Sequence, residues 1–126
     1  KRAMPLPVSA PFHTSLMAPA GERLAQDLAS VPLASPEVPV IHNVHARPEQ
    51  DAEQIRALLV RQIRSPVQWV ACVRYMTDAG VRRVLEVGPG KVLGGLCKRI
   101  DAELECLYSE EPADLDKALQ LAPANN

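Results

Sequence analysis

The sequence predicts an α/β fold in which helices flank a mostly parallel sheet. Segments with strand character and segments with helical periodicity alternate along its 126 residues. Alanine, valine and leucine dominate while aromatic residues make up only 3%, so we expect a largely aliphatic core. Hydrophobic residues at 47% and charged residues at 23% are typical of a globular domain.

The first element expected is an extended segment over Met4–Val8, because prolines flank its apolar residues. Apolar residues then recur every four positions between Leu16 and Leu28, which indicates an amphipathic helix ending near Val31. Proline is tolerated in the first turn of a helix, so Pro19 places the regular start at residue 18 or 19.

The middle of the chain predicts a strand and two helices. The β-branched segment Val38–Val44 is typical of a buried strand. Asp51 is expected to cap a helix, with Gln54 three residues later. Ser65–Gln68 has the pattern of a capped helix start with proline at its first position, and Gly80 is expected to end that helix.

The last third predicts a strand that runs into a tight glycine turn within residues 81–90. We expect a helix from about Lys91 to Ile100, a strand over residues 104–108 and a short helix over Pro112–Leu121. Residues 122–126 are expected to form a frayed tail.

Composition argues against several classes of function. The formal net charge is −1 and basic residues are not clustered, so we do not expect nucleic-acid binding. No apolar run is long enough for a membrane span, and no signal peptide is visible. Cys72, Cys97 and Cys106 are an odd, widely spaced set, which predicts free and mostly buried thiols, and a cytoplasmic location.

The segment Val87–Lys98 has some features of a phosphate-binding loop, because a glycine turn precedes a helix. A P-loop requires Ser or Thr where Val92 stands, and a dinucleotide-binding turn requires glycine where Leu93 stands. A tight strand-to-helix turn is therefore the favoured interpretation, with Lys98 and Arg99 complementing the dipole of the following helix.

Histidines are the remaining candidates for chemistry. His42 and His45 are three apart, in and just after a predicted strand, where positions three apart point to opposite faces, so no metal site is predicted. No serine or cysteine lies in a recognisable nucleophile–base pattern. His13 follows the first predicted strand, where reactive groups gather in α/β sheets, but a structural or solvated role is the commoner one for such a residue.

Four segments in order resemble the C-terminal part of bacterial malonyl-CoA:acyl-carrier-protein transacylases. They read PVSAPFHTSLMAP, VPVIHNV, ALLVRQIRSPVQW and EVGPGKVLGGLCKRI. The resemblance extends from about Pro5 to Ile100. It implies the C-terminal portion of an α/β-hydrolase-like large subdomain over residues 9–121. Residues 1–8 would be the exit strand of an inserted ferredoxin-like small subdomain.

The resemblance implies a ping-pong acyl transfer without a cofactor. The substrates would be malonyl-CoA, a coenzyme A thioester, and acyl carrier protein with its phosphopantetheine thiol, and a serine would carry the malonyl group between them. His13 matches the family's catalytic histidine. Gln62 matches the residue whose main-chain carbonyl orients that histidine in place of a carboxylate.

Five further residues match family positions near the substrate. Phe12 stands where phenylalanine accompanies a preference for malonyl over methylmalonyl in related polyketide acyltransferases. Asn43, Gly88, Gly90 and Val92 match motif positions that we expect to support the substrate site.

The family's serine elbow, its carboxylate-binding arginine and its N-terminal oxyanion-hole residues have no counterpart here. We therefore predict that the 126-residue chain alone is inactive, and that it either self-associates or retains the missing N-terminal part. The alternatives are a non-catalytic module that binds acyl carrier protein or coenzyme A, and a piece of a polyketide synthase acyltransferase. The basic residues considered for carrier docking are Lys1, Arg2, Lys98 and Arg99.

Overall fold

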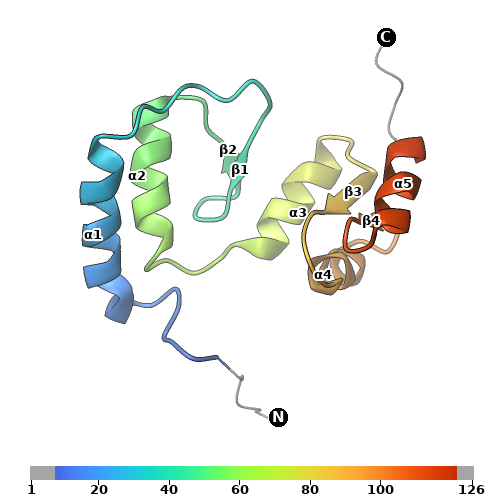
Figure 1. Ribbon diagram of the computed structural model, residues 1–126, viewed down its shortest axis with the longest axis horizontal. Coiled ribbons are helices and arrows are strands. Elements are labelled where there is room, and N and C mark those ends of the chain that lie inside the picture. The colour runs from blue at the N-terminus through green and yellow to red at the C-terminus, as the bar shows by residue number, and fades with distance from the viewer. Residues whose placement is uncertain (1–7, 122–126) are drawn as a thin grey trace. The chain divides into compact units, whose positions relative to one another are not determined.

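The computed structural model describes residues 8–121, with side chains for residues 8–120 (Figure 1). The chain forms two compact units, Lys1–Cys72 and Val73–Asn126, which are described one at a time below. Apart from Val8, which lies outside any helix or strand, the predicted exit strand over residues 1–8 lies outside the described residues. The predicted frayed tail over residues 122–126 lies outside them as well.

The first unit holds a short 3₁₀ helix, two α-helices, a small hairpin and the start of a third helix. These are η1 (Ser15–Met17), α1 (Ala18–Ala29), β1 (Ile41–His42), β2 (Arg47–Pro48), α2 (Ala52–Gln62) and α3 (Trp69–Asp78). Helix α1 begins at Ala18 with Pro19 in its first turn, which confirms the predicted start.

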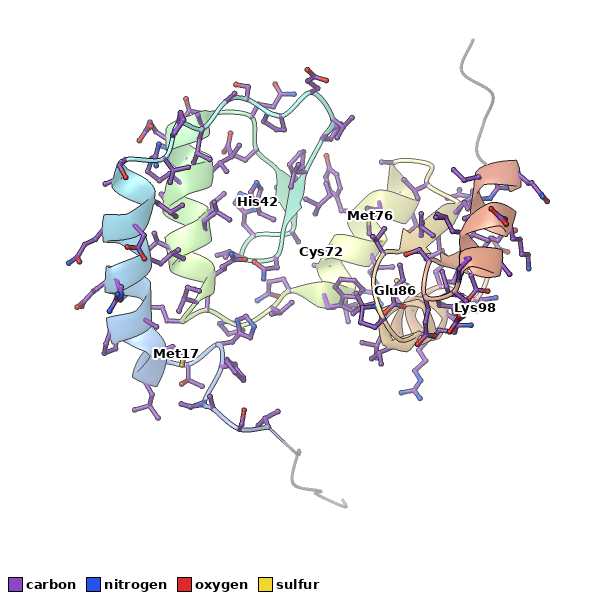
Figure 2. The ribbon with its side chains drawn as sticks, viewed as in Figure 1. Met17, His42, Cys72, Met76, Glu86 and Lys98 are labelled. Carbon is purple, nitrogen blue, oxygen red and sulfur yellow. The ribbon has the colours of Figure 1, made fainter. Side chains whose placement is uncertain are left out.

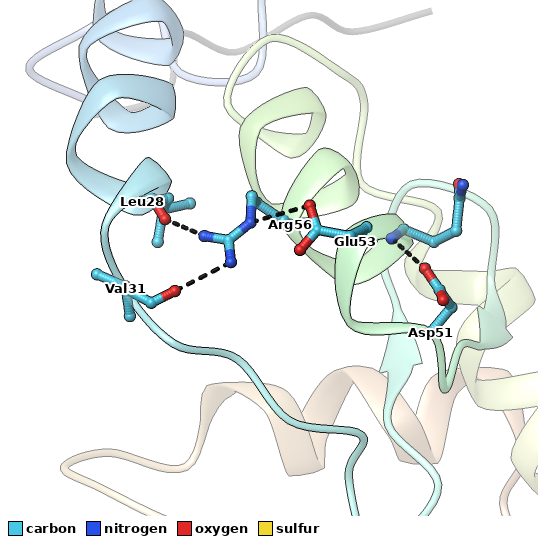
Figure 3. Close-up of polar contacts among 6 residues, drawn as sticks. Leu28, Val31, Asp51, Glu53 and Arg56 are labelled. Carbon is cyan, nitrogen blue, oxygen red and sulfur yellow. Dashed lines mark hydrogen bonds and ion pairs between the residues drawn. The ribbon is translucent and has the colours of Figure 1, made fainter.

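The start of α2 also confirms the prediction. The Asp51 carboxylate accepts a hydrogen bond from the Gln54 main-chain N–H at 2.8 Å (Figure 3), so it satisfies one of the free donors of the first helical turn. The local sequence signal was sufficient here because donor and acceptor lie three residues apart.

The predicted buried strand over Val38–Val44 is wrong in extent and in pairing. Only Ile41–His42 is a strand, and it pairs antiparallel with Arg47–Pro48. Ala46 has a φ of 56° and donates its N–H to the His42 carbonyl at 2.8 Å, which folds the chain back on itself. This turn makes a hairpin out of a segment whose composition had indicated a longer strand.

The predicted helix start at Ser65–Gln68 is also wrong, because α3 begins at Trp69. The Ser65 hydroxyl donates to the Arg61 carbonyl at 2.8 Å, so it bonds back to α2 instead of capping the next helix. The Gln68 N–H donates to the Asn43 carbonyl at 2.8 Å. That bond ties the segment between α2 and α3 to the hairpin loop.

Helices α1 and α2 pack side by side and run antiparallel (Figure 1). Gly21 in α1 is buried, and a Cβ at its position would lie 3.6 Å from the Val60 carbonyl oxygen and 3.8 Å from Cβ of Ile63. These are ordinary van der Waals distances, so the start of α1 packs against the end of α2 at this glycine.

Arg56 joins the opposite ends of the two helices (Figure 3). Its guanidinium donates to the Leu28 carbonyl and, at 3.0 Å, to the Val31 carbonyl, while its Nε lies 3.3 Å from a carboxylate oxygen of Glu53. The two carbonyls lie at the end of α1 and just after it, where main-chain oxygens lack the N–H partner four residues later that a regular helix provides.

The second unit alternates strand and helix. Its elements are β3 (Arg83–Glu86), α4 (Val92–Ile100), β4 (Glu105–Tyr108) and α5 (Pro112–Leu121). Strands β3 and β4 are parallel, in a register that runs from Arg83 opposite Glu105 to Glu86 opposite Tyr108. Helices α4 and α5 both pack against β4. These elements and the parallel pair confirm the predicted α/β class, although the described residues also hold the antiparallel hairpin.

Gly80 ends α3 as predicted. It has a φ of 92°, its N–H donates to the Thr77 carbonyl, and the Val81 N–H donates to the Met76 carbonyl, each at 3.0 Å. This pair of bonds is the Schellman arrangement, which requires a residue with positive φ at the glycine position.

Figure 2 draws the side chains of the described residues; the buried hydrophobic ones are aliphatic or cysteine, and Val73 and Leu104 are the most enclosed. All three cysteines are free; Cys72 and Cys97 are buried and Cys106 is half-buried, which confirms the predicted thiols. Burial raises the pKa of Cys72, and burial, with a smaller contribution from Cys106, raises that of Cys97. No helix among the described residues is long and apolar enough to cross a membrane.

Candidate active site

His13 lies in a turn directly before η1 and is exposed. Its φ is 60°, in the left-handed region that costs an L-residue about 1 kcal/mol. The preceding Phe12 donates its N–H to the Ala10 carbonyl at 2.9 Å. A non-glycine residue in this conformation is uncommon outside tight turns and functional sites.

The imidazole of His13 meets the end of α2. Its Nδ1 lies 3.0 Å from the carbonyl oxygen of Gln62, the last residue of that helix. A carbonyl oxygen can only accept, so Nδ1 carries the hydrogen and the neutral ring keeps its free lone pair on Nε2. The arrangement holds one ring nitrogen and leaves the other available to take a proton.

The position of Gln62 explains why its carbonyl is available. The last carbonyls of an α-helix have no partner within the helix. The Gln62 oxygen accepts from the Ser65 N–H at 3.3 Å and has a second lone pair for His13. The close α1–α2 contact at Gly21 brings the residues before α1 to this helix end.

The other two predicted residues of the first unit lie in turns. Phe12 precedes His13 and is 55% exposed. Asn43 begins the loop between β1 and β2 and is half-buried, and its carbonyl accepts from Gln68. The predicted contact of Phe12 with an acyl group and the predicted support of the substrate site by Asn43 stay predictions.

Gly88, Gly90 and Val92 lie in the second unit. Gly88 and Gly90 have φ values of 123° and 88°, so this turn requires glycine at both positions. The Gly88 N–H donates to the Ser109 hydroxyl at 3.2 Å, and the Gly90 N–H donates to a Glu110 carboxylate oxygen at 3.0 Å. Val92 is 70% exposed at the start of α4.

The amino end of α4 is capped from within the chain. Glu86, at the end of β3, accepts from the N–H groups of Leu93 and Gly94 at 3.1 and 2.8 Å. Its carboxylate thus occupies the position that a bound phosphate would take in a phosphate loop. This agrees with the strand-to-helix turn favoured from the sequence.

His42 and His45 do not point to opposite faces as expected. Their rings are 6.0 Å apart at 87°, an edge-to-face contact, because the hairpin loop turns the chain between them. Burial, and secondarily His45, lowers the pKa of His42, and its Nε2 is buried without a hydrogen-bond partner in the described chain. No group of three or more potential metal ligands lies together within residues 8–121.

Comparison with known proteins finds relatives that match this chain over part of their own length. No family model matches the chain. The malonyl CoA-acyl carrier protein transacylases of Salmonella typhimurium and Escherichia coli K12 are 50% and 49% identical to it, over 94% and 96% of this chain. These stretches are 38% and 39% of the length of those two proteins.

The chain is homologous to the C-terminal part of malonyl CoA-acyl carrier protein transacylases. It spans about 39% of the length of these curated relatives. The match confirms the resemblance on which the assignment of His13 and Gln62 depends, while the roles of the two residues remain predictions.

Solved transacylase structures share the fold. An acyl-carrier-protein S-malonyltransferase from Burkholderia pseudomallei superimposes with a TM-score of 0.89 at 49% identity, covering 96% of this chain and 39% of that one. A malonyl-transacylase in complex with a type II polyketide acyl-carrier protein gives a TM-score of 0.90 at 45% identity, covering 97% of this chain and 40% of that one. The α/β fold of this chain is thus that of the matched part of the transacylase structures.

Several polar residues around these turns escaped sequence reasoning. Glu86, Ser109 and Glu110 close the glycine turn, yet each is separated from its partner by seven residues or more. Only the pairing of β3 with β4 brings Ser109 and Glu110 there. The sequence also gave no indication that Arg56 links two helices, because its acceptors are main-chain carbonyls 25 and 28 residues away.

Proposed function

We propose that this chain is the histidine-bearing part of a malonyl CoA-acyl carrier protein transacylase. The contact between His13 and the Gln62 carbonyl carries the proposal, because it leaves Nε2 free to accept a proton. Homology to the C-terminal part of the transacylases supplies the reaction. The nucleophilic serine would come from the part of those proteins that this chain does not span.

In the first half-reaction, Nε2 of His13 takes the proton of the serine hydroxyl as its oxygen attacks the malonyl thioester carbonyl. The tetrahedral intermediate collapses by breaking the carbon–sulfur bond. The departing coenzyme A thiolate takes the proton from the imidazolium. The malonyl group is then an ester of the serine, and His13 is neutral again.

In the second half-reaction, Nε2 takes the proton of the phosphopantetheine thiol of acyl carrier protein. The thiolate attacks the malonyl ester, and the serine oxygen leaves and is reprotonated by the imidazolium. Throughout, the Gln62 carbonyl keeps the Nδ1 hydrogen in place, so the ring presents the same nitrogen in both halves.

The remaining predicted residues take supporting roles in this proposal. Phe12 would lie against the acyl group and disfavour a 2-methyl branch, while Asn43, Gly88, Gly90 and Val92 would shape the substrate site. Lys98 and Arg99, both exposed in the last turn of α4, are the described residues proposed to meet acyl carrier protein. The N-terminal part of a transacylase would complete the site, and we place the reaction in the cytoplasm.

A chimaera tests the proposal. Residues 8–121 would replace the aligned C-terminal segment of the Escherichia coli transacylase, and malonyl transfer from malonyl-CoA to acyl carrier protein would be measured. We expect activity in the chimaera and a loss of about 10²–10⁴-fold in His13→Ala, which removes the general base. Gln62→Ala should stay within about twofold, since the contact uses the main chain.

Two outcomes would count against the proposal. Activity that survives in His13→Ala would show that His13 is not the base. A folded but inactive chimaera that still binds acyl carrier protein would favour the non-catalytic binding module. Comparing malonyl-CoA with methylmalonyl-CoA would test the role of Phe12, because a preference for the branched group contradicts it.

A further inference from the structure

We infer that Thr14 is a positioning residue that holds His13 in its left-handed conformation through a side-chain hydrogen bond. The inference rests on the proposed function of His13, and it adds a residue to which no role had been given. The Thr14 hydroxyl donates to the Pro11 carbonyl at 2.8 Å. The bond therefore spans the turn that contains Phe12 and His13.

The direction of this bond distinguishes Thr14 from an ordinary helix cap. Thr14 occupies the cap position of η1, with extended φ and ψ of −125° and 168°. A threonine there commonly accepts a hydrogen bond from the first turn of the following helix. Thr14 makes no such side-chain bond to η1. Its hydroxyl bonds backward, across the histidine turn.

The main chain of Thr14 connects the same turn to the helix. Its carbonyl accepts the N–H of Met17 at 3.0 Å. Thr14 thus bonds to the turn through its hydroxyl and to η1 through its carbonyl, and so it joins the two. Because α1 follows η1 directly and packs on α2, Thr14 relates the His13 ring to the helix end that carries Gln62.

His13 needs such support because its backbone is strained. A φ of 60° disfavours a histidine relative to a glycine, so the turn persists only if neighbouring bonds hold it. Relaxation of the turn would move the imidazole away from the Gln62 carbonyl. The ring hydrogen would then no longer be fixed on Nδ1. Both effects would lower the fraction of molecules with Nε2 correctly placed.

The first experiment requires no catalysis. The imidazole ¹⁵N shifts of His13 would be recorded in the chimaera, without substrate, at about pH 8, where a free imidazole is neutral. We expect the shifts of a single tautomer with hydrogen on Nδ1. In Thr14→Val, which keeps the shape but removes the hydroxyl, both shifts should move toward the average of two tautomers. Thr14→Ser should restore the original shifts.

Thr77 offers a matched control. Its hydroxyl also donates to a carbonyl three residues back, that of Arg74 at 3.1 Å, but it lies in α3 and not in the histidine turn. Thr77→Val removes the same type of bond. It should leave the His13 shifts unchanged. The control therefore shows whether a shift change comes from the histidine turn or from the loss of any one hydroxyl hydrogen bond.

Kinetics in the chimaera give the second readout. Thr14→Val should lower kcat about fivefold with KM for malonyl-CoA within about twofold, and Thr14→Ser should recover kcat. Unchanged shifts and kcat in Thr14→Val, or an equal effect of Thr77→Val, would overturn the inference. These results differ from a failure of the proposed function, which would instead appear as activity that survives in His13→Ala or as a folded chimaera that is inactive with His13 and Thr14 both unchanged.

Discussion

The turn at His13 and the turn at Gly88–Gly90 solve the same backbone problem in different ways. Both contain positive φ angles, and both stand just before a helix. The glycine turn uses the residue that accepts such angles, and its N–H groups are bonded to side chains of Ser109 and Glu110. The other turn places a histidine at a strained position and leaves one ring nitrogen open.

The difference separates a turn whose N–H groups bond to side chains of the same unit from one that leaves an imidazole nitrogen available for the proposed chemistry. In the glycine turn, Glu86 also caps the helix that follows, so few polar groups remain for a ligand. In the histidine turn, the exposed His13 has both a strained backbone and an imidazole nitrogen, Nε2, that is available as an acceptor. Such costs persist in folded proteins mainly where function requires them.

Breaking the glycine turn should have the largest effect on stability. Gly88→Ala places a Cβ in open space, so its cost is the φ of 123° and not a clash, and we expect a loss of about 1–3 kcal/mol. Gly95→Ala is the matched control, since that helical glycine also faces open space and should gain up to about 1 kcal/mol. Urea denaturation would compare them; equal effects would contradict the role of φ.

Opening the cap of α4 should come next. Glu86→Ala removes the acceptor for two N–H groups and should cost about 1 kcal/mol in urea denaturation. If Glu86 occupies the position of an anion, sulfate should raise the melting temperature of Glu86→Ala more than that of the unchanged chain. Equal responses would show that the amino end of α4 does not bind anions. Alanine at the exposed Glu103 is the control.

Relieving the histidine turn should have a smaller effect of opposite sign. His13→Gly and His13→Ala both lose the bond to Gln62, but only glycine accepts a φ of 60° without strain. His13→Gly should therefore be more stable than His13→Ala by about 0.5–1 kcal/mol. Urea midpoints would measure the difference. A more stable alanine variant would mean that the turn carries no strain.

The smallest expected effect concerns the pH dependence of the first unit. Burial and His45 lower the pKa of His42, with Glu49 opposing, so the unfolded chain binds its proton more tightly than the folded chain does. Stability is therefore complete above the unfolded pKa of about 6.5 and falls as pH drops below it. His42→Leu should lose less stability between about pH 7.5 and 5 in urea denaturation. Equal slopes would contradict this.

The sequence predicted elements well where the signals were local. The Asp51 cap, the Gly80 end of α3 and the elements from β3 to α5 lie where expected, because each depends on residues a few positions apart. The strand at Val38–Val44 and the helix start at Ser65 were wrong, because bonds between distant segments, such as Gln68 to Asn43, decide them.

The site was partly predictable for the same reason. Family resemblance singled out His13 and Gln62, and the structure places them in hydrogen-bond contact. The strain at His13 and the backward bond of Thr14 could not be read from the sequence, since threonine at that position has the pattern of a cap. Whether the hydroxyl accepts from the following helix or donates to a preceding carbonyl depends on a turn geometry that composition does not encode.

The partner of His13 belongs to the main chain, and this has a consequence for variation. Every amino acid at position 62 would carry a main-chain carbonyl, so a change of that codon leaves the acceptor in place. Mutation can alter the pair only indirectly, by changing where α2 stops or how the turn at Thr14 holds His13, or by exchanging the histidine itself. No single substitution at position 62 therefore removes the acceptor. Weakening it directly would require a chemical change of the backbone, such as an ester in place of the peptide bond after Gln62.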